Sequence, residues 1–177
     1  MPSKDLLFDI STLDPTKVLA DIEEIRKYNP QRYEMEQLTA VLHMDAEQAL
    51  CVGYKDLTEN EFWVRGHFPG TPLMPGVVML ECVAQLCSYF VLKYDMLGAD
   101  YVGFGGLEGV KFRDPVFPGS RFYAICKRTR LRRGAMVTCA FQGVVNGEIV
   151  LEGELKGVAI PKSALQPKPV AHSGASR

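Results

Sequence analysis

The sequence predicts an α+β fold in which a curved antiparallel sheet wraps around one long central helix. Residues 76–97 are apolar on nearly every side of a helix, and Glu81 is their only carboxylate before Asp95. A helix of this kind in a soluble chain must be enclosed by other structure. Six further segments carry the alternation or the turn signals of strands, and a strongly curved sheet would cover the helix.

The strand segments fall on both sides of the helix in the chain. Two precede it and four follow it: 36–44, 48–56, 98–112, 120–132, 135–145 and 148–160. Asn146-Gly147 separates the last two, and Asn-Gly is a strong two-residue hairpin signal. Residues 60–66 are expected to be a short extended approach to His67. This combination of elements is the hot-dog architecture.

The N-terminal part is predicted to add a helix over residues 13–29. Asp14 is a suitable N-cap, Pro15 suits the first helical position, and Asn29-Pro30 would end the helix. The expected organisation is therefore an N-terminal helical extension (1–30), a single hot-dog domain (31–162) and a disordered tail (163–177) rich in Pro, Ser, Ala and Lys.

Composition restricts the function classes. The chain has 177 residues, 47% of them hydrophobic, which suits one sizeable core, and its net charge is −1. No basic stripe is present, so nucleic acid is not an expected partner. The N-terminus lacks the pattern of a signal peptide, which favours a cytoplasmic protein. Polar residues divide the run at 76–97 into apolar segments far shorter than the ~20 residues of a membrane span.

The cysteines and histidines do not have the spacing of a metal or disulfide site. The five cysteines are an odd number without a CxxC pair, so buried free thiols in a reducing compartment are expected. His43, His67 and His172 share no ligand spacing, and we expect no metal.

The segment "GHFPGTPLMPGVVMLECVAQ" at 66–85 joins a loop to the apolar helix. Its prolines fix φ and remove N–H donors, so the loop is stiff and would present His67 in a fixed position. The Pro75-Gly76 step opens the helix. The first turn of a helix has unpaired N–H groups, and Gly76 leaves room for a ligand oxygen to reach them.

Glu81, Gln85 and Ser88 would form a thin polar stripe on the helix. Burial of a carboxyl group raises its pKa, which suits a general acid. Simpler interpretations remain open from the residues alone. His67 could be an ordinary loop histidine, and Glu81 could form a structural ion pair, with Arg65, Arg113 or Lys111 as partner.

The same segment closely resembles the signature G-H-F-P-x-x-P-x-M-P-G-V-x-x-x-E-x-x-A-Q of the β-hydroxyacyl-acyl-carrier-protein dehydratases. "VKFRDPVFPGS" at 110–120 resembles the second block of that family, and the resemblance covers about residues 25–160. It implies a lyase of fatty acid biosynthesis that converts a β-hydroxyacyl thioester into a trans-2-enoyl thioester. Glutamate at position 81 and Val77 after Gly76 favour the non-isomerising branch.

The resemblance also implies roles for residues. His67 would be the catalytic base, and Glu81 the catalytic carboxylate. Gln85 would orient Glu81, and the Gly76 N–H would hold the thioester carbonyl. The remaining substrate-binding candidates are Phe68, Pro75 and Val77.

The resemblance further implies the partners of the chain. No cofactor is expected, since the acyl group arrives on phosphopantetheine, carried by acyl carrier protein or coenzyme A. The family forms homodimers with active sites shared between subunits, and many members are trimers of dimers.

This chain departs from the family pattern at several positions. Gln31 and Glu34 alter the usual P-H-R-Y/F-P motif, Gly103 stands where many members carry a gating tyrosine, and Ser120 replaces an aspartate. The open alternatives are a hot-dog thioesterase, an enoyl-thioester hydratase, or a non-catalytic acyl-binding paralogue.

Overall fold

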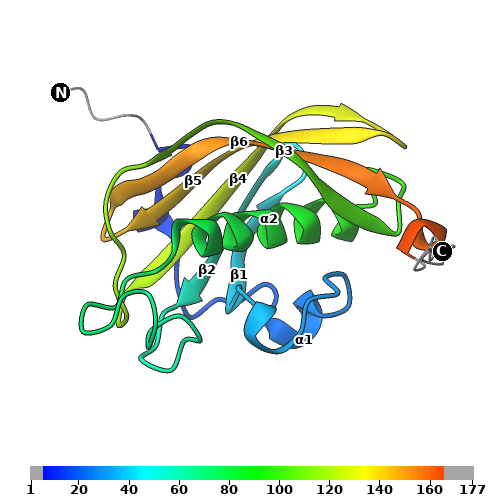
Figure 1. Ribbon diagram of the computed structural model, residues 1–177. Coiled ribbons are helices and arrows are strands. Elements are labelled where there is room, and N and C mark those ends of the chain that lie inside the picture. The colour runs from blue at the N-terminus through cyan, green and yellow to red at the C-terminus, as the bar shows by residue number, and fades with distance from the viewer. Residues whose placement is uncertain (1–5, 166–177) are drawn as a thin grey trace, which may run out of the picture.

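A six-stranded antiparallel sheet curves over one long helix in the computed structural model, which describes residues 6–165 (Figure 1). The strand order is β1-β2-β4-β5-β6-β3, so β1 and β3 are the edges. The strands are β1 (Ala40–Asp45), β2 (Leu50–Asp56), β3 (Tyr101–Phe112), β4 (Arg121–Arg132), β5 (Met136–Val145) and β6 (Glu148–Ile160). The α+β prediction is confirmed, and each predicted strand segment overlaps an observed strand.

The central helix α2 (Gly76–Lys93) begins where the sequence predicts and lies against the inner face of the sheet. Alternate residues of the strands pack against it, among them Cys51, Ala124 and Phe141. By length and composition α2 could cross a membrane. Its side chains form the core of this domain instead, since Cys82, Leu86 and Phe90 are fully buried.

The chain that precedes β1 covers part of the surface of α2 that faces away from the sheet. Ile25 of α1 (Ile22–Ile25) is buried in the core, and the Asn29 side-chain amide donates to the Gln85 carbonyl at 2.9 Å. Glu24 forms an ion pair with Lys93 at the end of α2. This segment therefore positions the half of the helix that carries Gln85.

The predicted N-terminal helix over 13–29 is wrong. Asp14 accepts hydrogen bonds from Thr16 in a local turn, and Ala20 forms an antiparallel bridge with Val41 on edge strand β1. The only α-helix in this region is the single turn α1, and its N-cap is Asp21. Pairing with the open edge of β1 satisfies the backbone at 19–20, which a helix through this segment would prevent.

Residues 6–13 cover the outer face of the sheet. Leu6, Leu7, Phe8 and Ile10, together with Leu13, pack on a second apolar cluster. The sheet contributes Leu50, Val52, Ile125 and Val144 to this cluster. The short helix η1 (Ile10–Thr12) lies within the segment. Residues 6–13 are therefore packed against the outer face of the sheet.

Two further expectations need adjustment. Residues 62–66 form turns rather than an extended strand, because Gly66 and His67 both donate their backbone N–H to the Trp63 carbonyl. Residues 162–165 form the short helix η3 (Lys162–Leu165), although disorder was expected from 163. The rest of the predicted tail, 166–177, lies outside the described residues. One further short helix, η2 (Tyr33–Met35), precedes β1.

Candidate active site

The loop from His67 to Pro75 closes on itself before α2 begins. Phe68 and Thr71 exchange backbone hydrogen bonds, and Leu73 N–H donates to the His67 carbonyl at 2.8 Å. The Met74 N–H donates to the Val116 carbonyl at 2.7 Å, which ties the loop to the segment after β3. The loop is therefore as rigid as its prolines predict.

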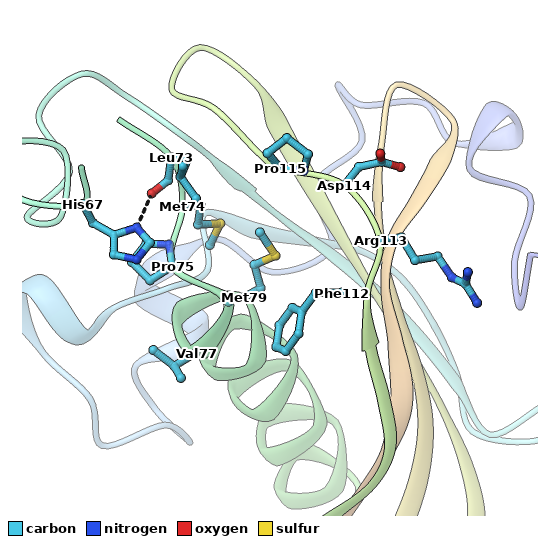
Figure 2. A pocket seen from close by; sticks show the side chains of 11 residues that line it. His67, Leu73, Met74, Pro75, Val77, Met79, Phe112, Arg113, Asp114 and Pro115 are labelled. Carbon is cyan, nitrogen blue, oxygen red and sulfur yellow. Dashed lines mark hydrogen bonds between the residues drawn. The ribbon is translucent and has the colours of Figure 1, made fainter. Parts of the chain in front are cut away.

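His67 is held in one orientation by this loop. Its Nδ1 lies 3.0 Å from the Leu73 carbonyl oxygen (Figure 2). A carbonyl only accepts, so Nδ1 carries a proton, and in the neutral form of the ring Nε2 is the nitrogen that can accept one. The Phe68 ring stacks on the imidazole with centroids 4.3 Å apart. A half-buried, oriented imidazole with a free Nε2 is suited to accept a proton.

His67 lines a cavity of about 530 Å³ at the start of α2, together with Pro75, Gly76 and Val77 (Figure 2). Pro75 is the N-cap residue and offers no side-chain hydrogen bond to the helix. Within the described part of the chain, the Gly76 and Val77 N–H groups have no backbone partner. Two donors and the positive end of a long helix therefore lie beside the imidazole.

Gly76 is required here by close packing as well as by ligand access. A Cβ at this position would lie 2.6 Å from Cε1 of Phe112, the last residue of β3. Phe112 lines the same cavity and is half exposed. The aromatic ring thus forms one wall of the cavity and lies against the helix start (Figure 2).

Glu81 lies on α2, more than one turn beyond Gly76, and is half-buried in the chain. Gln85 donates from Nε2 to Oε1 of Glu81 at 2.8 Å and to the Met35 carbonyl, and its Oε1 accepts from the Gln37 N–H at 2.9 Å. Gln85 is fully buried with its side-chain amide satisfied, so it holds the carboxylate in one place. No ion pair of Glu81 is present among residues 6–165, so the ion-pair interpretation is wrong for this part of the chain.

Glu81 lines a second, smaller cavity of about 160 Å³ between α2 and the strand pair β3–β6. Ser88, Gly103 and Phe104 also line it, and His67 does not. A single chain therefore brings His67, Pro75, Gly76 and Val77 together but leaves Glu81 in a separate cavity. Phe68 supports the imidazole without lining either cavity, and Gln85 lies behind Glu81.

Two residues near these cavities were not among the predicted site residues. Phe112 lies in the "VKFRDPVFPGS" block, so its position in that block was an available signal. Gln31 reaches the Glu81 cavity from the segment between α1 and η2, and only its departure from the family motif drew attention to it. Within residues 6–165, no group of three His, Cys, Asp or Glu side chains is arranged to hold a metal ion.

Solved structures with this arrangement are hot-dog proteins. The dehydratase heterocomplex ApeI:P from Xenorhabdus doucetiae matches with a TM-score of 0.67 at 14% identity, over 80% of this chain and 93% of that chain. The Escherichia coli PaaI protein matches with a TM-score of 0.51 at 14% identity, over 67% and 80% of the two chains. At such identities the likeness defines the fold class only, and that class is the hot-dog fold.

The chain belongs to the FabA-like domain family, whose model matches residues 29–154. It is 32% identical over 145 residues to the 3-hydroxyacyl-[acyl-carrier-protein] dehydratase FabZ of Rhizobium rhizogenes, over 81% of this chain and 90% of that protein. It is 36% identical over 135 residues to the FabZ of Clostridium botulinum, over 76% and 92% of the two proteins.

Proposed function

We propose that this protein dehydrates β-hydroxyacyl thioesters of acyl carrier protein to trans-2-enoyl thioesters in fatty acid biosynthesis. The observation that carries the proposal is the His67 geometry. An imidazole whose Nδ1 contacts a backbone carbonyl lies beside the Gly76 and Val77 N–H groups, which have no backbone partner among the described residues, at the start of a long helix. Membership of the FabA-like family and the FabZ relatives support the same reaction.

His67 is the proposed base of the reaction. Its Nε2 removes a proton from the carbon between the thioester carbonyl and the β carbon. The developing negative charge on the carbonyl oxygen is stabilised by the Gly76 N–H and by the helix start. Stabilisation of this kind applies to the transition state more than to the bound substrate, so it accelerates the chemical step.

Glu81 is the proposed acid. Gln85 donates a hydrogen bond to Oε1 of Glu81, so Oε2 is the oxygen proposed to contact the substrate. As the C–O bond to the β-hydroxyl breaks, Oε2 delivers a proton, a carbon–carbon double bond forms and water leaves. The proton taken by His67 later restores Glu81 through solvent. The reaction needs no metal or redox cofactor, and phosphopantetheine carries the acyl chain.

The complete site is proposed to form in a homodimer, with His67 from one subunit and Glu81 from the other. In one chain the two residues line separate cavities. Phe104 and Phe112, together with Val77, are exposed around these cavities, and β3 is an open edge that a second chain can extend. A trimer of such dimers is the proposed higher assembly, and we infer a cytoplasmic location.

The test is turnover of a short β-hydroxyacyl thioester, on acyl carrier protein and on coenzyme A, followed by enoyl absorbance. We expect wild-type activity that falls about 10²- to 10⁴-fold in His67→Ala and in Glu81→Gln, while both variants remain folded dimers. Thioester hydrolysis without enoyl formation would instead establish the thioesterase alternative. Binding without turnover at several chain lengths would establish an acyl-binding paralogue.

A further inference from the structure

Gln31 completes the surroundings of Glu81 from outside the helix. It lines the Glu81 cavity, and its Nε2 lies 3.5 Å from the same Oε1 that Gln85 holds. Two side-chain amides thus converge on one carboxylate oxygen. Within the described residues the other oxygen, Oε2, has no hydrogen-bond partner.

The carbonyl end of the Gln31 side chain is buried and unpaired. Its Oε1 has almost no solvent exposure and accepts no hydrogen bond from the described residues. A buried acceptor without a donor is unfavourable, and such an atom commonly accepts a hydrogen bond from a bound ligand or water. The donor that a β-hydroxyacyl group brings to this cavity is its hydroxyl hydrogen.

We propose that Gln31 binds the β-hydroxyl of the substrate and turns it toward Glu81. The Gln31 carbonyl accepts the hydroxyl hydrogen, which leaves a lone pair of the hydroxyl oxygen directed at Oε2 of Glu81. The Gln31 N–H helps Gln85 to fix the opposite oxygen. This inference rests on the proposed function and adds a substrate-binding residue to it.

Other groups around Glu81 do not offer the same contact. The titratable side chains that share its cavity are Lys156 from β6 and Cys87 from α2. Lys156 pairs with Glu108, and Cys87 lies against Cys139 in the core. Ser88 is the remaining hydroxyl in the cavity, and it lies two turns further along α2.

The experiment compares ligands with and without the hydroxyl. In a His67→Ala background, which prevents turnover, binding of a 3-hydroxyacyl thioester and of the saturated thioester of equal length is measured by calorimetry. Gln31→Leu should lower the affinity for the hydroxylated ligand about tenfold and leave the affinity for the saturated ligand unchanged. Gln48→Leu, the same change at an exposed turn position, should affect neither.

Turnover provides a second readout. Gln31→Glu keeps an acceptor oxygen but places a second carboxyl beside Glu81. A neighbouring carboxylate makes a carboxyl hold its proton to higher pH, so the alkaline limb of the kcat profile should move upward. Gln48→Glu, the same change at the exposed turn position, should leave the limb in place.

The results separate this inference from the proposed function. Equal weakening of both ligands by Gln31→Leu, or no weakening of either, would refute the role of Gln31. An unmoved alkaline limb in an active Gln31→Glu protein would refute the placement of Gln31 beside Glu81, on which this role depends. If the wild type fails to dehydrate any thioester, the proposed function itself fails. If the wild type is active and the Gln31 variants show unchanged ligand affinities and an unchanged kcat profile, only this inference is refuted.

Discussion

Two inactive variants should restore activity to each other when they are mixed. His67→Ala removes the base from the cavity at the helix start, and Glu81→Gln removes the acid from the separate cavity between α2 and β3–β6. If each site takes His67 from one subunit and Glu81 from the other, a mixed dimer contains one site with both substitutions and one site with neither. The intact site then works normally.

The expected recovery follows from counting subunits. Random exchange of equal amounts gives about half mixed dimers, and each has one of its two sites intact, so activity reaches about a quarter of the wild-type value. Loss of an acid or a base costs about 10²- to 10⁴-fold. The parent homodimers therefore contribute at most about 1% each, and recovery is easily distinguished from background.

The assay is enoyl absorbance after the two variants are co-expressed with different tags and the doubly tagged dimer is purified. The purified mixed dimer should show about half of the wild-type activity, since every molecule has one intact site. A doubly substituted chain paired with a wild-type chain is the matched control. Activity of the mixed dimer no higher than that of either parent would mean that each site uses His67 and Glu81 of one chain, and would refute the shared arrangement.

Three further predictions concern stability and reactivity. Gly76→Ala places a methyl 2.6 Å from the Phe112 ring, so it should cost about 1–3 kcal/mol in urea unfolding and lower kcat/KM, whereas Gly66→Ala meets nothing within 4 Å and should be neutral for stability. Hydrogen bonds from Arg26 lower the pKa of Glu36, so this pair stabilises the fold above the unfolded carboxyl pKa of about 4.3 and loses its effect as pH falls further. Glu36→Gln should therefore lower the free energy of unfolding by less than about 1 kcal/mol at pH 7, because solvent screens the pair, and have little effect at pH 3, as measured by urea unfolding at each pH. All five cysteines are buried free thiols, and burial raises the pKa of several, so a thiol reagent at pH 8 should react only after denaturation.

The parts of the fold that follow local rules were predictable from the sequence. The Asn146-Gly147 hairpin and the start of α2 at Gly76 fall where the turn and loop chemistry places them. Asp14 and Pro15 carry an equally clear helix signal, yet no helix begins there. The bridge between Ala20 and Val41 depends on an open strand edge, which is a property of the assembled sheet and has no local signature.

The candidate site also combines contacts that the sequence predicts locally with contacts that depend on the assembled fold. Glu81 and Gln85 are four residues apart on one helix, so their hydrogen bond follows from helical spacing. Gln31 lies fifty residues before Glu81, in a segment that the Asn29 side chain joins to α2 by a hydrogen bond to the Gln85 carbonyl. A contact between residues so far apart in the sequence depends on the path of the chain around α2, and no periodicity in the sequence predicts that path.

The composition of α2 gives a further reason to place the reaction here. An apolar pattern on all sides predicts burial on all sides, but Val77 is 73% exposed, while Leu80, Glu81 and Ala84 are only partly covered. These positions form one open stripe on a helix that is otherwise buried. A stripe facing only water would be expected to carry polar side chains. Apolar residues around a single carboxylate instead suit a wall that an acyl chain and a second subunit cover, which is the environment that the proposed dehydration requires.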